Sequence, residues 1–210
     1  MSAPIDQLPV GELVNRAKAG SLNAFSELVA RYEGRLLNFL RQRTRSVEDA
    51  EDVTQESFLR AWRQLDRYDS RWQFSTWLFT IGSRLAVNHA QRRAGGCEGR
   101  GAGGEGFSVR EDGDPARAAS DAEQRRNLWS LAERTLGESE RVALWLRYAE
   151  ELPAGDIGRV LGKSAVGVRV LIHRAKRKLA RALDESARGV RTGGGMCGAE
   201  RVVVSEMRSG

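Results

Sequence analysis

A glycine-rich segment divides this chain of 210 residues into two parts. The stretch AGGCEGRGAGGEGFSVREDG, residues 94–113, contains eight glycines in twenty positions. A segment of this composition buries too little apolar surface to offset the conformational entropy that ordering would cost. We therefore expect a flexible linker over residues 94–120, with a separately folded part on either side of it.

Both parts show the periodicity of helices. Apolar side chains at i, i+3, i+4 and i+7 spacing define one face of a first helix: Phe25, Leu28, Val29, Tyr32, Leu36, Phe39 and Leu40. We expect further helices from about Val47 to Leu65 and from Ser75 to Arg92, the latter with Ser75 and Thr76 as N-caps. Only the short run Val202–Val204 has a pattern compatible with a strand.

The sequence thus predicts an all-α protein. Its two small helical domains span residues 21–93 and 121–186 and are joined by the linker. An N-terminal extension with the start of the first helix precedes them (1–20), and a disordered tail follows them (187–210).

The composition is that of an ordinary soluble protein. Hydrophobic residues make up 40% of the chain, and no apolar run reaches the roughly 18 residues that a membrane span needs. The start, MSAPIDQLPVGEL, lacks the basic stretch and apolar core of a signal peptide. We therefore expect a cytoplasmic protein without membrane insertion.

Two cysteines, Cys97 and Cys197, lie among glycines. We expect both to be passive, reduced thiols. The alternatives are a redox pair or a part in a metal site, but the sequence has neither a CxxC motif nor a Cys/His spacing that would support them. The expectation is therefore no metal and no cofactor.

The stretch PAGDIGRVLGKSAVGVRVLIHRAKRKLARAL, which begins at Pro153, has the pattern of a helix-turn-helix. Pro153 suits the first turn of a short helix, Gly162 the left-handed residue that ends it, and Ser164 the cap of the next helix. From Lys163 to Arg181 there are seven basic residues and no acidic one. A solvated helix face normally carries both positive and negative charges, whereas this one carries only positive charges. We therefore predict that this helix enters the major groove of duplex DNA. The alternative is an amphipathic hairpin with a merely solvated basic face.

The stretch RYDSRWQFSTWLFTIGSRLAVNHAQRR, residues 67–93, combines aromatic side chains with a basic helix face. The aromatics are Tyr68, Trp72, Phe74, Trp77 and Phe79. The residues that repeat every four positions are Thr80, Arg84, Asn88 and Arg92, and Arg71 and Arg93 adjoin them. Rings stack on unpaired bases, cations hold phosphates and amides read base edges, so the face predicts a single-stranded nucleic-acid site. For any single aromatic, a place in the core is the alternative.

Five carboxylates gather in EDAEDVTQES, residues 48–57. On a helical wheel, Asp49, Asp52 and Glu56 fall opposite the apolar side that Ala50 and Phe58 define. The acids could favour the helix dipole, bind a metal for hydrolysis, or dock a basic protein partner. No histidine or phosphate-binding loop lies nearby to support the metal.

Three stretches together resemble bacterial extracytoplasmic-function (ECF) RNA polymerase sigma factors, members of the sigma-70 family. They are AEDVTQESFLRAWRQLDRYD, FSTWLFTIGSRLAVNHAQRR and LGESERVALWLRYAEELPAGDIGRVLGKSAVGVRVLIHRAKRKL. The resemblance covers about Glu12–Arg93 and Leu128–Leu183, and it rests on the combination rather than on any one piece. It implies a promoter-specificity subunit of RNA polymerase with no catalysis of its own.

The resemblance also implies partners and site residues. In this family the DVxQE helix docks on a coiled coil of the polymerase β′ subunit, which here assigns Asp49, Asp52, Gln55, Glu56 and Arg63. The helix Trp77–Arg93 would read the minus-ten element as a melted strand, with Arg71, Trp77, Arg84, Asn88, Arg92 and Arg93. The helix-turn-helix would read the minus-thirty-five duplex and sit on the β flap, with Lys163, Ser164, Arg169, His173, Arg174, Lys176 and Arg177. An anti-sigma factor is a further implied partner.

The chain departs from the family pattern at the start of the last helix. Where the family often has Thr followed by Val-Lys-Ser-Arg, this chain has Gly167, Val168, Arg169, Val170 and Leu171. Two other functions stay open. One is a free-standing helix-turn-helix regulator that binds duplex DNA without polymerase, and the other, more distant, is a hydrolase that uses the acidic helix.

Overall fold

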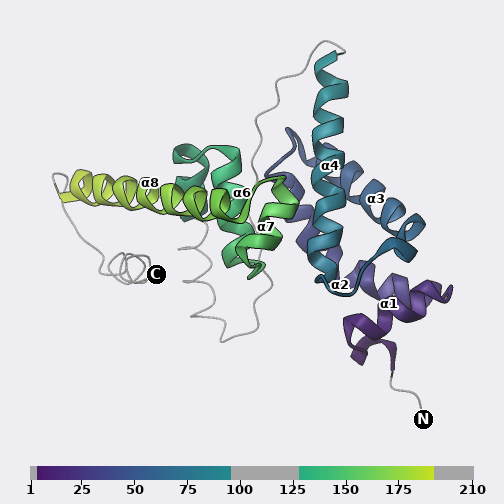
Figure 1. The fold of residues 1–210 in the computed structure, drawn as a ribbon. Helices are drawn as coiled ribbons and strands as arrows, with labels where there is room; N and C mark the ends of the chain where they lie inside the picture. Colours follow the sequence, from purple (N-terminus) through teal and green to yellow (C-terminus); the bar gives the residue numbers. More distant parts are fainter. Residues whose placement is uncertain (1–3, 96–127, 192–210) are drawn as a thin grey trace.

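The computed structural model describes residues 4–95 and 128–191, and the regular structure in both ranges is helical. The first range contains α1 (Val10–Lys18), α2 (Leu22–Arg41), α3 (Val47–Arg63) and α4 (Phe74–Gly95), with 3-10 turns at Ile5–Gln7 and Leu65–Arg67. The second contains a helical segment at residues 128–135, then α6 (Glu138–Tyr148), α7 (Ala154–Leu161) and α8 (Ala165–Arg191) (Figure 1). The all-α prediction is confirmed.

Several sequence predictions fall outside the described residues. The predicted linker from residue 96 onward, both cysteines and the strand-like run Val202–Val204 belong to this group. Helical order in α8 continues to Arg191, beyond the predicted end of the second domain at residue 186.

The first half is built around α2, which packs against α1, α3 and α4. Ser21 caps α2 because its Oγ accepts a hydrogen bond from the amide of Ala24 at 3.3 Å. The predicted apolar face of α2 is buried, with Leu28, Leu36 and Phe39 fully inside. The helix α1 lies in the segment where the sequence predicts an extension with the start of the first helix; it is a separate helix that covers one side of α2 and buries Leu13, Val14 and Ala17.

The helix α4 begins one residue earlier than predicted, and the predicted caps are wrong. Ser75 and Thr76 lie inside its first turn, where they are only 4% and 2% exposed. The amide of Trp77 donates to the carbonyl of Gln73 at 3.2 Å, so the helical hydrogen bonds start ahead of both residues. Burial of Phe74 against Tyr32 and Tyr68 accounts for this earlier start.

The second half contains the predicted helix-turn-helix. Pro153 is the N-cap of α7, and Gly162 ends this helix in the left-handed conformation, with φ of 66°. The Oγ of Ser164 accepts a hydrogen bond from the amide of Gly167 at 3.1 Å and so caps α8, as predicted. Gly158 has no room for a side chain, since a Cβ would lie 2.5 Å from the carbonyl oxygen of Lys163. This glycine lets the turn fold closely onto α7.

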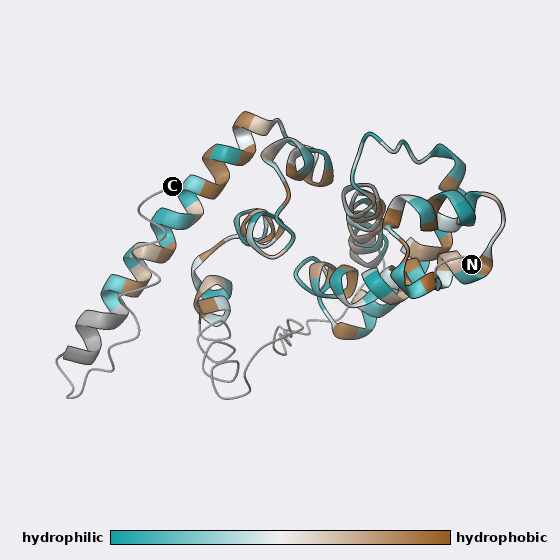
Figure 2. Ribbon diagram, turned by 90° about the horizontal axis from the view of Figure 1, so that it is seen from below, coloured by the Kyte–Doolittle hydropathy of each residue, from teal (hydrophilic) through white to brown (hydrophobic). Residues whose placement is uncertain are grey.

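The two halves contact each other directly, which the sequence patterns did not predict. The helix α7 packs on α4, and one hydrophobic cluster runs from α2 and α4 into α6 and α7 (Figure 1). At its centre the rings of Phe39, Phe79 and Trp145 have centroids 5.2 to 6.0 Å apart. Periodicity identifies an apolar face but not the distant segment that covers it. Coloured by hydropathy, α8 alternates between polar and apolar residues, as expected for a helix with one buried face (Figure 2).

Candidate nucleic-acid and protein interfaces

The helix α3 presents an acidic face to solvent. Its capping residue Ser46 accepts a hydrogen bond from the Asp49 amide at 3.1 Å, which sets the start of the helix. The predicted contact residues Asp52, Gln55 and Arg63 are exposed, and Glu56 is half-buried, with its Oε1 3.7 Å from Nη2 of Arg60. The neighbouring Glu48 and Glu51 are exposed as well.

One residue of this face was missed by the sequence analysis. Leu59 is 53% exposed and lies one turn from both Gln55 and Arg63, in the middle of the acidic face. An apolar side chain ringed by charges is typical of a protein-docking surface, which has an apolar centre and a polar rim. The signal was present in the sequence, because a four-residue step from Gln55 reaches Leu59.

The predicted exposure of Asp49 is wrong. Its side chain is buried, with the residue only 7% exposed, and its Oδ1 lies 3.8 Å from Nε2 of His89 in α4. The helical wheel assumed one buried side, whereas α3 packs against both α2 and α4 and therefore has a wide buried surface. Asp49 thus offers almost no surface to a partner, and the acidic face consists of the residues from Asp52 onward together with Glu48 and Glu51.

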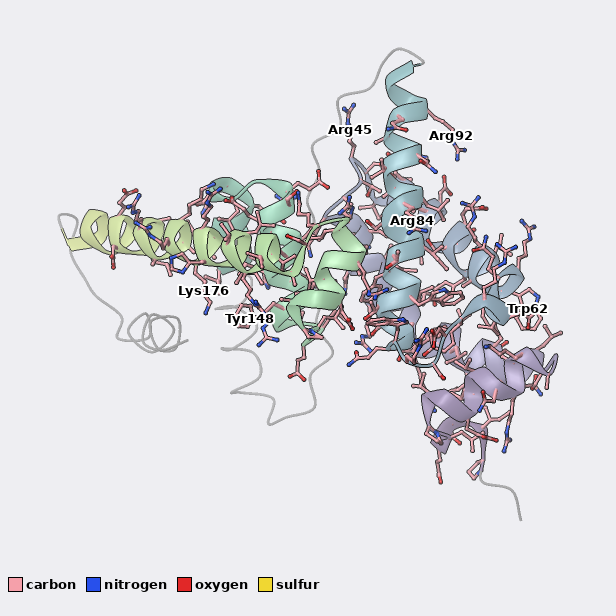
Figure 3. The ribbon with its side chains drawn as sticks, viewed as in Figure 1. Arg45, Trp62, Arg84, Arg92, Tyr148 and Lys176 are labelled. Atoms are coloured by element: carbon pink, nitrogen blue, oxygen red, sulfur yellow. The ribbon has the colours of Figure 1, made fainter. Side chains whose placement is uncertain are left out.

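The predicted polar face of α4 is exposed along the outer half of the helix. Arg84, Asn88 and Arg92 all point to solvent, and Figure 3 shows Arg84 and Arg92 along the part of α4 that projects from the bundle. Thr80, which shares their spacing, is partly buried and its hydroxyl donates to the carbonyl of Thr76 at 2.7 Å. The side chain of Arg93 lies outside the described residues. The face therefore combines two guanidinium groups with one amide.

Most of the aromatics near the start of α4 belong to the core, as the alternative interpretation held. Phe74 and Phe79 are buried, and Trp77 is half-buried with its ring centroid 5.3 Å from that of Tyr68. Arg71 is exposed instead, and its Nε donates to Oδ2 of Asp69 at 2.7 Å. This hydrogen bond lowers the pKa of the Asp69 carboxyl.

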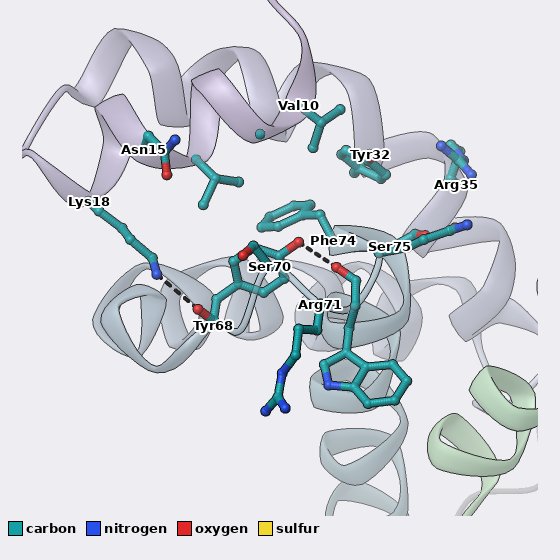
Figure 4. Close-up of a pocket in the computed structure, with 14 residues that line it drawn as sticks. Val10, Asn15, Lys18, Tyr32, Arg35, Tyr68, Ser70, Arg71, Phe74 and Ser75 are labelled. Atoms are coloured by element: carbon teal, nitrogen blue, oxygen red, sulfur yellow. Dashed lines mark hydrogen bonds between the residues drawn. The ribbon is translucent and has the colours of Figure 1, made fainter.

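A pocket of about 610 Å³ opens between α1, α2 and the loop that leads into α4 (Figure 4). Its walls carry the aromatic side chains of Tyr32, Tyr68 and Phe74. Cationic groups at its lining come from Lys18, Arg35 and Arg71. The Nζ of Lys18 donates to the carbonyl of Tyr68 at 2.9 Å, and the Tyr68 hydroxyl donates to the carbonyl of Trp72 at 2.6 Å, so the loop is tied down at both ends.

The outward face of α8 is cationic. The helix buries Val168, Ala175 and Leu179 against α6, α7 and the segment at 128–135. The predicted contact residues that point to solvent are Lys163, Ser164, Arg169, His173, Arg174 and Arg177. Lys176 is partly buried, with its Nζ 5.5 Å from the ring centroid of Tyr148 (Figure 3).

Polar contacts accompany the apolar cluster between the halves. The Nε of Arg35 donates to Oε1 of Glu150 at 3.1 Å, and a second bond joins Nη2 to Oε2. Burial raises the pKa of the Glu150 carboxyl, and the Arg35 guanidinium offsets part of that rise. The hydroxyl of Thr76 donates to Oδ2 of Asp156 at 3.0 Å, so a residue first predicted to cap α4 instead joins α4 to α7.

The contact between the halves also leaves buried polar atoms unpaired. Among the described residues, these atoms lie at the end of α2 and on α6. They are the Nε atoms of Arg41, Arg43 and Arg141, Oε1 of Gln42 and Nε1 of Trp145. A buried donor or acceptor without a partner costs free energy, so these groups weaken the contact. The apolar cluster and the paired polar groups therefore hold the two halves together, and the unpaired buried groups oppose them.

Within residues 4–95 and 128–191, no group of three or more His, Cys, Asp or Glu side chains is placed to hold a metal ion. None of the helices in these ranges is long and apolar enough to cross a membrane.

Comparison with known proteins gives two family matches. The model of sigma-70 region 2 matches residues 28–95, and that of sigma-70 region 4 matches residues 133–179. The chain is 30% identical over 189 residues to the ECF RNA polymerase sigma factor BldN of Streptomyces coelicolor, covering 89% of this chain and 70% of BldN. It is 31% identical over 180 residues to the RNA polymerase sigma-H factor of Pseudomonas aeruginosa, covering 82% of this chain and 93% of that protein.

Solved structures agree with this assignment. CnrH, solved in complex with the cytosolic domain of CnrY, aligns with a TM-score of 0.56 at 26% identity, over 82% of this chain and 96% of CnrH. The sigma factor RpoE of Bartonella quintana, solved with the anti-sigma factor NepR, shares the fold with a TM-score of 0.59 at 17% identity, over 78% of this chain and 98% of RpoE. The matched regions are those that carry α3, α4 and the helix-turn-helix. The chain therefore belongs to the ECF group of the sigma-70 family, RNA polymerase sigma factors that act as transcription initiation factors rather than enzymes.

Proposed function

We propose that this sigma factor binds core RNA polymerase with α3, reads a melted minus-ten strand with α4, and reads the minus-thirty-five duplex with α8. The observation that carries the proposal is the separation of charge on two packed helices. The helix α3 exposes carboxylates on the turns that precede Leu59, whereas its neighbour α4 exposes Arg84, Asn88 and Arg92. One face suits a basic protein and the other suits a polyanion. The proposed place of action is the cytoplasm, where polymerase and promoter DNA meet.

The docking face consists of Asp52, Gln55, Glu56, Leu59 and Arg63. Leu59 supplies apolar area at the centre, and the carboxylates supply complementarity to a basic partner, for which the β′ coiled coil is proposed. An interface of this kind uses charge mainly for selectivity and rate of association, and it uses the apolar centre for affinity.

The minus-ten face carries two of the three side-chain chemistries that an unpaired strand needs, cations and an amide, and the pocket near it supplies the third, aromatic rings. Arg84 and Arg92 attract phosphates, and the Asn88 amide both donates to and accepts from a base edge. The pocket beside the loop 68–73 adds aromatic walls and cations, which suit a base that has left the stack. Arg71 and Trp77 stay in the proposal as flanking residues.

The minus-thirty-five face is the outward side of α8 with the turn before it. Helix-turn-helix proteins place the second helix in the major groove, and the exposed Arg169, Arg174 and Arg177 provide the attraction to phosphates. The β flap is the proposed polymerase contact of this half.

The two halves must part for this function. Elements centred 25 base pairs apart lie about 85 Å from each other along straight duplex at 3.4 Å per base pair. The helices α4 and α7 are in direct contact here. In this arrangement α4 and α8 cannot reach the two promoter elements at the same time. Residues 96–127 contain enough chain, at about 3.3 Å per residue, to span roughly 100 Å. We infer that the free protein is closed and that it opens when it binds polymerase and promoter.

A protein that holds the sigma factor is also part of the proposal. CnrH was solved with the cytosolic domain of CnrY bound, and it is similar to this chain over most of its length. The proposed partner here is an anti-sigma factor. A partner that bound both halves at once would stabilise the closed arrangement.

Transcription with purified core polymerase tests the main proposal. The full chain and core polymerase are mixed with genomic DNA, and transcript starts are sequenced. We expect starts that share two upstream elements and that require both proteins. Sequence-selective duplex binding without any core-dependent transcript would favour the free-standing regulator instead.

Charge reversal on α3 tests the docking face. Asp52→Arg with Glu56→Arg leaves the apolar side of the helix untouched, so we expect normal folding and at least a ten-fold loss of core polymerase affinity. Asp6→Arg with Glu33→Arg makes the same charge change at exposed positions outside α3 and should bind as wild type does. Full binding by the α3 variant would refute the docking assignment.

A further inference from the structure

The side of α8 that points away from the protein begins with two exposed valines. Val166 is 65% exposed and Val170 is 45% exposed. They lie one turn apart and fall opposite the buried Val168, Ala175 and Leu179. Single exposed apolar residues are common on protein surfaces, but these two are in line on the first two turns of the helix.

The same line continues with basic side chains. His173 and Arg177 follow Val170 at the spacing of successive turns, and all three are exposed. Gly167, between the two valines, adds no side chain to the face. The line through Val166 and Val170 is therefore apolar over the first two turns of α8, with Arg169 beside it, and is cationic after them. The first turns of the second helix are also the part of a helix-turn-helix that contacts base edges.

The major groove contains one apolar group at the base edges, the C5-methyl of thymine. An isopropyl side chain neither donates nor accepts hydrogen bonds, so it has no favourable contact with the polar edges of the other bases. Where it covers such an edge, it removes water from a donor or acceptor and supplies nothing in return. Valines in this position thus favour thymine.

We propose that Val166 and Val170 select thymine at the base pairs that face the first two turns of α8, through contact between their methyl groups and the thymine C5-methyl. The inference rests on the proposed function, in which α8 enters duplex DNA, and it adds the atoms that choose the sequence. The proposed function assigns Arg169, Arg174 and Arg177 to phosphates, and a phosphate contact carries no sequence information.

Charge identifies DNA rather than a protein as the partner of this apolar pair. From Lys163 to Arg181, both included, the chain has seven basic residues and no acidic one. The apolar pair is therefore surrounded by charge of the sign that a phosphate backbone attracts. Leu59, the exposed leucine on α3, lies instead on a helix whose preceding turns carry carboxylates, among them Asp52 and Glu56.

Removal of single methyl groups from DNA tests the inference. The full chain, assembled with core polymerase, first selects duplexes from a library randomised over about one helical turn, ~10 base pairs. Each thymine of the selected upstream element is then replaced singly by uracil, which pairs identically and lacks only the methyl. At one or two positions we expect a loss of affinity of about four-fold, the size that one buried methyl group predicts.

Variants connect this loss to the two valines. Val166→Ala and Val170→Ala should each weaken binding to the thymine duplex and make the thymine and uracil duplexes equivalent at one position. Alanine raises helix propensity, so the loss cannot come from a weakened helix. Leu22→Ala, at a residue of α2 that is 66% exposed, is the matched control and should keep the full preference for thymine.

The possible outcomes separate this inference from the function beneath it. Equal affinity of wild type for thymine and uracil duplexes, with selective and salt-dependent binding retained, would overturn the methyl contact and leave the duplex role intact. Failure to select any upstream sequence would overturn both. Weaker binding of the valine variants to core polymerase without DNA would assign this face to a protein and also overturn the inference.

Discussion

The guanidinium carbon of Arg159 in α7 lies 3.3 Å from the ring centroid of Trp72, in the loop before α4. Trp72 is one of the aromatics that the sequence nominated for stacking on unpaired bases. A guanidinium above a ring occupies the place that a base would take. In the closed arrangement, the second half of the protein therefore covers a surface that the proposed minus-ten role would use on a melted promoter.

Charge reversal at the contact should open the protein. Glu150→Arg places a second cation beside Arg35 at a buried site, so we expect the halves to separate and the radius of gyration in small-angle scattering to rise. The swap of Arg35→Glu with Glu150→Arg should restore the wild-type radius. Glu151→Arg makes the same charge change at the exposed neighbour and serves as the control. An unchanged radius for Glu150→Arg would mean that this pair does not hold the halves.

The closed form should respond to pH through Glu150. Burial in the closed form raises the pKa of this carboxyl, so the closed form binds its proton more tightly than an open form does. The resulting stabilisation is fully present below the ordinary pKa and is lost as the pH rises through the raised pKa. We expect the closed fraction to fall as the pH rises above the ordinary carboxyl pKa of 4.5 and through the raised pKa of Glu150, which a scattering series would measure.

Glu150→Gln is the control for this pH dependence. The amide cannot titrate and keeps an oxygen that Arg35 can bond, so the slope should vanish and the neutral-pH protein should be at least as closed as wild type. The same slope in the variant would assign the titration to another group.

Asp49 should affect stability rather than polymerase binding. The residue is 7% exposed and lies between α3 and α4, near His89. Asp49→Asn should lower the free energy of unfolding by about 1 kcal/mol, measured by urea denaturation. The affinity of the folded variant for core polymerase should stay within about two-fold of wild type. A large loss of polymerase affinity with normal stability would return Asp49 to the docking face.

Asn88 should act in promoter melting. Asn88→Ala leaves a base edge unmatched, which costs roughly 1–3 kcal/mol, so transcription from a duplex promoter should fall by about ten-fold or more while holoenzyme assembly stays normal. A template mismatched across the minus-ten region should recover part of the yield, because strand separation no longer depends on base capture. Permanganate reactivity of unpaired thymines measures melting directly.

An exposed asparagine elsewhere is the control for this variant. Asn23→Ala, on the solvent side of α2, should melt the promoter as wild type does. Equal melting by Asn88→Ala and wild type on duplex DNA would make the α4 face an ordinary solvated surface.

Much of the local structure could be predicted because it depends on neighbours in the sequence. The apolar face of α2 follows from side chains three and four positions apart, which lie side by side on a helix. The turn between α7 and α8 follows from Gly162, which takes a left-handed conformation at no steric cost, and from Ser164, whose hydroxyl caps the next helix. The cationic side of α8 follows from composition alone.

The tertiary structure decided which of these surfaces stay in contact with solvent. Asp49 is buried and Leu59 is exposed because α3 packs against two helices at once, and a wheel drawn for one helix cannot include the second neighbour. Trp145 packs against Phe39 and Phe79 of the other half, a contact between distant segments that periodicity within one helix does not predict. The sequence by itself determined the helices, the ends that glycine or serine caps mark, and the apolar faces, since these depend on hydrogen bonds and side chains within a few positions. Burial depends on which distant segment covers each face, and only the folded chain determines that.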